Sequence, residues 1–109
     1  MKKIAICQFN GRVSPRFNHS AEVVMVTMDH SGLVEKKQVI FTATLNPSDL
    51  ATLLGLHQIE TLICGGVKKD CQQILQKNNI ELIDNVIGNV DDVLRLYQKG
   101  ELHRGDVVN

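Results

Sequence analysis

From residue 46 onward, the chain alternates between helical and strand-like patterns, and this alternation constrains its fold more than any other feature. Apolar residues recur with a helical period over residues 46–57, 68–79 and 89–97. Short apolar runs typical of strands separate these helices at residues 61–64 and 80–87. Strand–helix–strand units join parallel strands through right-handed crossovers. The second half therefore predicts a parallel portion of sheet with helices on its faces.

The first half of the chain carries strand patterns without helices. Apolar runs or alternation predict strands at residues 4–7, 21–29 and 34–42, with a hairpin tip at residues 30–32. The predicted element order is β-β-β-α-β-α-β-α. It corresponds to an α/β fold in which a mixed five-stranded sheet is flanked by helices.

The length of 109 residues leaves room for one domain, which we place at residues 1–109. Asn46 and Asn89 are suitable caps for the first and last helices, and Gly100 is a suitable stop for the last one. We expect the core to span residues 2–102 and the polar tail, residues 103–109, to be loosely held.

The charge balance and the cysteine count exclude several classes of protein. Twelve basic and twelve acidic residues give a formal net charge of zero, whereas a general nucleic-acid binder needs surplus positive charge. No apolar run is long enough to cross a bilayer, and the amino terminus lacks the pattern of a secretory signal. Three cysteines cannot all pair within one chain. We expect reduced thiols in a cytoplasmic protein, without nucleic-acid or membrane partners.

The three cysteines lie where a site is expected. Ligands of open α/β sheets bind beyond the carboxyl ends of the parallel strands. Cys7 ends the first strand, Cys64 ends the fourth, and Cys71 lies about one turn into the next helix. If these strands are neighbours, the thiols converge loosely on one rim, where they could hold zinc, copper(I) or an iron–sulfur cluster. No C-x-x-C pair is present, and small buried hydrophobic residues are the alternative interpretation.

Two further segments carry candidate binding residues. Gly65 and Gly66 open a helix and are a weak signal for an anion cradle, although a packing or turn requirement is the more frequent reason for such glycines. The polar segment 11–20 contains Arg12 and Arg16, which could bind an anionic ligand, and His19, which could coordinate a metal. The alternative is a solvated loop anchored by a buried Phe17.

Three segments occur in a specific order. They are Gly11-Arg12-Val13-Ser14-Pro15-Arg16-Phe17, Leu62-Ile63-Cys64-Gly65-Gly66, and the closing strand and helix from Ile80 to Leu94. Together these segments resemble the dinitrogenase iron-molybdenum cofactor-binding family, and the resemblance covers residues 2–102. It implies a ribonuclease-H-like three-layer fold and a role in holding iron–sulfur or iron–molybdenum cluster precursors during nitrogenase cofactor assembly.

The resemblance also bears on individual residues. Family members often have a histidine, a cluster ligand, where this chain has Arg16, and His19 could substitute for it. Cys64 matches a position where the family frequently has cysteine. The predicted cofactor-binding residues are Arg12, Arg16, His19, Cys64, Gly65 and Gly66, and the predicted metal ligands are Cys64, His19 and Cys7.

We therefore predict a non-catalytic carrier or accessory protein for an iron–sulfur or iron–molybdenum type cluster. Its partners would be the cluster and a cluster-donor or acceptor protein, and it would be a monomer or a weak homodimer. The alternative is a cofactor-free interaction or regulatory module on the same fold, which the replaced histidine favours. A phosphodiester-cleaving enzyme ranks third, because two-metal hydrolysis needs clustered carboxylates and the first strand contains none.

Overall fold

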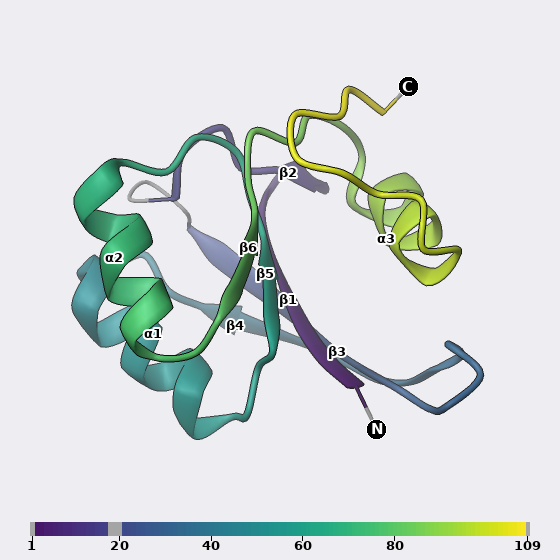
Figure 1. Ribbon diagram of the computed structural model, residues 1–109, viewed down its shortest axis with the longest axis horizontal. Coiled ribbons are helices and arrows are strands. Elements are labelled where there is room, and N and C mark those ends of the chain that lie inside the picture. The colour runs from purple at the N-terminus through teal and green to yellow at the C-terminus, as the bar shows by residue number, and fades with distance from the viewer. Residues whose placement is uncertain (1, 18–20, 109) are drawn as a thin grey trace.

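The computed structural model describes residues 2–17 and 21–108, which form a sheet with helices on both faces (Figure 1). The strands are β1 (Lys2–Phe9), β2 (Arg12–Val13), β3 (Glu22–Met28), β4 (Val34–Phe41), β5 (Thr61–Ile63) and β6 (Glu81–Ile83). The helices are α1 (Pro47–Leu56), α2 (Lys69–Lys77) and α3 (Val90–Gln98). None of the helices in the described part of the chain is long and apolar enough to span a membrane.

The strands form one mixed sheet in the order β4-β3-β1-β5-β6, and β2 pairs with β1. Strands β1, β5 and β6 run parallel, whereas β3 is antiparallel to both β1 and β4. This arrangement confirms the predicted α/β class, the parallel second half and the antiparallel hairpin of the first half.

Alternating residues of the central strands fill two separate cores, one on each face of the sheet. Ala5 and Cys7 of β1 belong to the core beneath α1 and α2. Ile4 and Ile6 of the same strand belong to the core beneath α3. Figure 1 shows the corresponding layers, with α1 and α2 on one side of the sheet and α3 on the other.

The helix boundaries follow the capping signals in the sequence. The Asn46 side chain accepts a hydrogen bond from the Asp49 amide at 2.8 Å, and Pro47 occupies the first turn of α1. At the start of α3, the Asn89 side chain accepts from the Asp91 amide. Both predicted caps are confirmed.

The short strand β2 was not predicted. Asn10 and Gly11 both have positive φ angles, 52° and 75°, which let the chain reverse in a tight turn after β1. β2 then pairs antiparallel with the end of β1. An Asn-Gly pair is a strong hairpin signal, so the sequence contained the information for this strand.

The predicted strand at residues 80–87 is too long, because β6 ends at Ile83. Its neighbour β5 also ends at residue 63, and the regular strand pairing ends there. Asn85 adopts a positive φ of 57°, and its amide donates to the Gly65 carbonyl oxygen at 2.9 Å. Residues 84–88 therefore leave the sheet and cross the end of β5.

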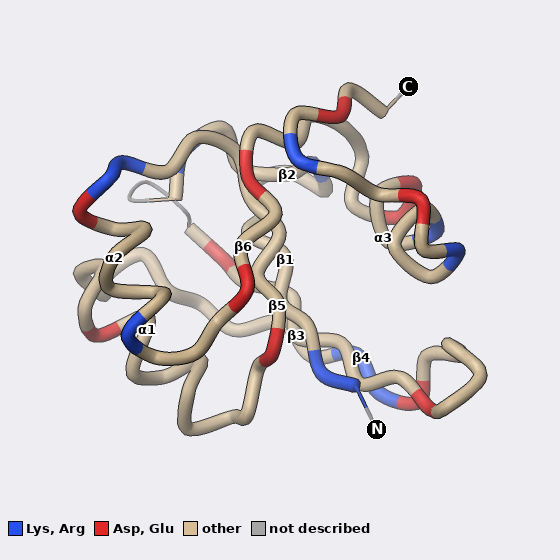
Figure 2. Tube along the Cα trace, in the orientation of Figure 1, with Lys and Arg blue, Asp and Glu red and all other residues tan. Residues whose placement is uncertain are grey.

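The prediction of a loosely held tail is wrong, because the segment after Leu102 is hydrogen-bonded to residues 84–87. The Gly105 amide donates to the Asp84 carbonyl oxygen, and the Val108 amide donates to the Ile87 carbonyl oxygen at 2.7 Å. The Arg104 guanidinium forms an ion pair with the buried carboxylate of Asp84. Figure 2 shows the charged residues of this segment beside the end of β6.

We expect Arg104→Gln to lower the melting temperature by several degrees. The Asp84 side chain is 2% exposed, so loss of its cationic partner would leave a buried carboxylate without compensation. The matched control is Arg95→Gln, which removes an exposed ion pair with Asp92 and should leave the melting temperature unchanged. Equal melting temperatures for the two variants in thermal unfolding would contradict the proposed role of Arg104.

Candidate functional site

A hollow of about 420 Å³ lies beyond the carboxyl ends of β5 and β6, where the strand order predicts a ligand site. We call it the carboxyl-end hollow. It is lined by Arg12, Val13, Pro15, Gly65, Gly66, Asn85, Val86, Ile87 and Gly88. Three separate parts of the chain, the segment after β1 and the turns after β5 and β6, therefore form its walls.

Residues 14–17 cross the sheet at this end and are held by backbone hydrogen bonds. The Ser14 amide donates to the Cys7 carbonyl oxygen at 2.8 Å, and the Phe17 amide donates to the Gly66 carbonyl oxygen at 3.0 Å. The Phe17 side chain is 2% exposed and packs in the core beneath α1 and α2. The predicted Phe17 anchor is confirmed, and the ordered crossing fixes both arginines relative to the sheet.

The two glycines serve this crossing directly. The Gly65 amide donates to the Ser14 carbonyl oxygen at 2.9 Å, and the Gly66 amide donates to the Pro15 carbonyl oxygen at 2.7 Å. A Cβ atom at Gly65 would lie 2.4 Å from each of these two oxygens. Gly65 is therefore required by close backbone packing. Both glycines line the hollow, but their amides donate to the protein's own carbonyl groups.

Arg12 and Arg16 are both exposed and lie beside adjacent hollows. Arg12 lines the carboxyl-end hollow, whereas Arg16 lines a second hollow of about 400 Å³ with Gly66, Val67 and Lys68. Gly66 is common to both, so the two hollows adjoin. Their described linings contain three cationic side chains and no carboxylate. This charge distribution suits an anionic ligand.

Asp84 is an acidic residue next to this region, and its charge is compensated. Its side chain is buried and paired with Arg104, and it does not line either hollow. The negative charge of Asp84 is therefore engaged within the fold.

Cys7 and Cys64 lie together, as the strand order predicts, because Ile6 of β1 pairs with Ile63 of β5 immediately before them. Both are fully buried. Hydrogen bonding between the two thiols raises the pKa of Cys64 far above its usual range, and burial and the Asp84 charge act in the same direction. The thiol form of Cys64 is therefore strongly favoured in the folded protein.

Cys71 lies on α2 and belongs to the same buried core as Cys7 and Cys64. It is 4% exposed, and burial raises its pKa. The three cysteines form no disulfide. They occupy the core beneath α1 and α2, in keeping with the alternative interpretation as small buried hydrophobic residues.

His19 lies outside the described residues, so its predicted role as a metal ligand stays a prediction. Within residues 2–17 and 21–108, no group of three or more His, Cys, Asp or Glu side chains is arranged to hold a metal ion. Among the described residues, the charged side chains that line the two hollows are those of Arg12, Arg16 and Lys68.

Residues 85–88 form one wall of the carboxyl-end hollow and were missed by the sequence analysis. Extending the preceding strand to residue 87 placed them inside the sheet. The asparagine at 85 and the glycine at 88 are turn signals. If the strand had been predicted to end at residue 83, the turn after it would have been placed at the same end of the sheet as segment 11–20 and the glycines at 65 and 66.

The chain belongs to the dinitrogenase iron-molybdenum cofactor family, whose model matches residues 1–100. A comparison with curated proteins gives no match.

Solved structures share the fold. PH0822 is 20% identical, with coverage of 94% of this chain and 93% of that chain and a TM-score of 0.85. The MJ0327 protein of Methanocaldococcus jannaschii is 23% identical, with 94% and 92% coverage and a TM-score of 0.77. The apo form of the orange protein from Desulfovibrio gigas is 22% identical, with 100% and 97% coverage and a TM-score of 0.76.

We expect Gly65→Ala to destabilise the protein by about 1–3 kcal/mol, because the added Cβ would displace the backbone of residues 14 and 15. The control is Gly66→Ala, since the nearest atom to its added Cβ lies at 3.5 Å, an ordinary contact. That variant should stay within about 0.5 kcal/mol of the parent. Chemical denaturation provides the measurement, and equal losses in both variants would refute the explanation for Gly65.

We expect all three thiols to react slowly with a thiol reagent in the native protein at a pH of about 8, where an exposed cysteine is partly ionised. Burial blocks access, and the raised pKa values of Cys64 and Cys71 keep these groups as thiols. All three should react in denaturant. Ser48→Cys, at an exposed position, should add one fast-reacting thiol. Rapid native labelling of Cys64 would contradict this view.

Proposed function

We propose that the protein is a non-catalytic carrier or accessory protein that binds an anionic iron–sulfur or iron–molybdenum type cluster at the two adjoining hollows. The observation that carries this proposal is the lining of these hollows, where Arg12, Arg16 and Lys68 contribute positive charge and no carboxylate stands among the described lining residues. Membership of the dinitrogenase iron-molybdenum cofactor family supports the choice of cargo.

The donor set determines how such a cargo would be held. Guanidinium groups donate hydrogen bonds to anionic acceptors and neutralise their charge. The sulfide and thiomolybdate groups of a cluster are acceptors of this kind. Arg12 and Arg16 would therefore bind the cluster from the outside, and the turns at 65–66 and 85–88 would set the shape of the hollow.

The cysteines have a different place in this proposal. Cys64 and Cys7 lie behind the glycine turn and are fully buried, and thiolates are the form that binds metals. The raised pKa of Cys64 opposes formation of its thiolate in the folded protein. Coordination by Cys64 or Cys7 is therefore a secondary mode of binding in this proposal, and coordination by His19 is tested separately by its variant. A cluster-donor or acceptor protein would complete the carrier role.

The test is anaerobic reconstitution of the tag-free protein with iron and sulfide, with and without molybdate, followed by metal analysis and visible absorption. We expect the parent to retain metal, and Arg12→Gln and Arg16→Gln to weaken retention about tenfold each through the loss of a charge-assisted contact. Arg95→Gln is the matched control, because Arg95 lies on the exposed surface of α3 away from the hollows.

The results for the variants distinguish between the modes of binding and between the candidate functions. Loss of retention in Cys64→Ala with normal retention in the arginine variants would replace the charge-based mode with thiol coordination. Loss only in His19→Ala would assign the histidine as the ligand. Failure of the parent to retain metal under all these conditions would favour the cofactor-free interaction module instead.

A further inference from the structure

A hollow of about 590 Å³ lies at the opposite end of the sheet from the proposed cluster site, and we call it the amino-end hollow. Its walls come from the start of β1, the residues before or at the start of β5 and β6, the β3–β4 hairpin and the end of α3. Its polar lining includes Lys2, Glu60, Glu81 and Tyr97, and its apolar lining includes Met28 and Leu102. Its volume falls within the usual range for small-molecule sites.

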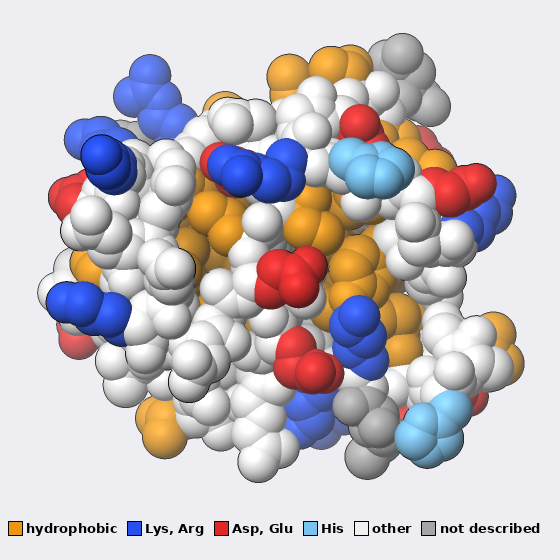
Figure 3. Space-filling model, in the orientation of Figure 1, with side chains coloured by type: hydrophobic (Ala, Val, Ile, Leu, Met, Phe, Trp, Pro, Cys, Tyr) orange, Lys and Arg blue, Asp and Glu red, His pale blue; other side chains and the backbone are white. Residues whose placement is uncertain are grey.

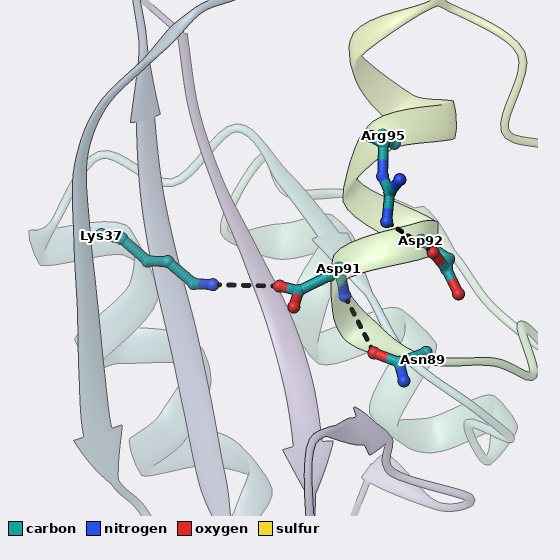
Figure 4. Close-up of polar contacts among 5 residues, drawn as sticks. All are labelled: Lys37, Asn89, Asp91, Asp92 and Arg95. Atoms are coloured by element: carbon teal, nitrogen blue, oxygen red, sulfur yellow. Dashed lines mark hydrogen bonds and ion pairs between the residues drawn. The ribbon is translucent and has the colours of Figure 1, made fainter.

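The walls of this hollow are tied to one another by specific contacts. At the end of α3, the Gln98 side-chain amide donates to the Gly32 carbonyl oxygen of the hairpin at 2.8 Å. At the start of α3, Asp91 pairs with Lys37 of β4 at 3.3 Å (Figure 4). These two contacts join both ends of the helix to the β3–β4 hairpin, and the contact at Gly32 and Gln98 lies in the wall of the hollow.

The Lys2 ammonium and the Tyr97 hydroxyl lie next to each other in the hollow. The hydroxyl of Tyr97 is buried and has no acceptor for its hydrogen among the described residues. The Lys2 ammonium lies 5.2 Å from the centroid of the same ring. A buried hydroxyl is normally satisfied. An anionic acceptor such as a carboxylate could satisfy both groups at once.

Negative charge is also present in the amino-end hollow. Hydrogen bonding to the Tyr97 hydroxyl oxygen raises the pKa of Lys2, and the charges of Glu60 and Glu81 act in the same direction, which keeps its ammonium charged. The Asp29 carboxylate is engaged by the amides of Ser31 and Leu33. The Glu81 carboxylate makes no hydrogen bond within the described part of the chain, so it is available to a cationic group.

An apolar floor completes the hollow. Met28, Ile83 and Leu102 line it and are each exposed by less than a tenth of their surface. Figure 3 shows acidic and basic side chains standing next to apolar surface on this face of the molecule. A matching ligand would carry a negative group, a positive group and an aliphatic body.

We propose that the amino-end hollow binds a small zwitterion of the amino-acid class with an aliphatic side chain. The ligand carboxylate would accept from Lys2 and Tyr97, the ligand ammonium would donate to Glu81, and the side chain would contact the apolar floor. This inference is independent of the proposed cluster site. None of the residues that line the carboxyl-end hollow or the second hollow beside it also lines the amino-end hollow.

The chain offers a direct reporter for this site, since Tyr97 is its single tyrosine and it contains no tryptophan. Titration with L-leucine and L-methionine should change the Tyr97 emission saturably, at concentrations up to about 10 mM for weak binding. The analogues 4-methylpentanoate and 3-methylbutylamine each lack one charge of leucine. We expect each to bind at least about tenfold more weakly.

Variants measured by calorimetry distinguish the site from nonspecific binding. Lys2→Gln and Tyr97→Phe should each weaken leucine binding about tenfold, whereas Arg12→Gln at the cluster site should leave it unchanged. Tyr97→Phe retains the ring and tests the hydroxyl alone. Absence of saturable binding of both amino acids would overturn the proposal, as would unchanged affinity in both the Lys2 and Tyr97 variants.

Discussion

The rest of the structure depends on the central strand β1, which is buried on both faces and paired along both edges. Residues Ile4, Ala5, Ile6 and Cys7 are all fully buried, and the strand pairs with β3 on one side and with β5 on the other. A strand in this position must be apolar throughout, because each face contributes to a different core. The antiparallel and parallel halves of the sheet therefore meet along β1.

The candidate cluster site follows from how the chain leaves this central strand. The β1–β2 hairpin directs residues 14–17 back across the carboxyl ends of the parallel strands, and the absence of a side chain at Gly65 lets the two backbones touch. The amides of this region are used within the protein. In the proposed function, ligand recognition would therefore depend on the long cationic side chains at the rim.

The sequence predicted the parts of the fold that depend on periodicity and capping. The three helices and the central strands have strong patterns, and Asn46 and Asn89 fixed two helix starts. The boundaries of β2 and β6 were harder to predict. A two-residue strand is too short to show a period, and apolar residues continue at Val86 and Ile87 after the chain has left the sheet. The polar tail depends on a distant buried partner, Asp84, which no local pattern reveals.

The candidate site was predictable to a similar degree. Strand order alone brings Cys7, Cys64 and the arginine-containing segment to one end of the sheet. Whether a side chain at that end faces a ligand or the core depends on alternation across the pleat, and the register places both cysteines in the core beneath α1 and α2. The amino-end hollow was not predicted, because its charged residues come from four separate places in the chain.

The docking of the carboxyl-terminal segment couples the end of the chain to the candidate site. The family model matches residues 1–100, whereas the residues that support the turn at 84–88 lie beyond it, at 104–108. One wall of the carboxyl-end hollow is therefore braced by a part of the chain that the family model does not match. A change in this short segment would alter that wall while the sheet and the crossing segment stay in place.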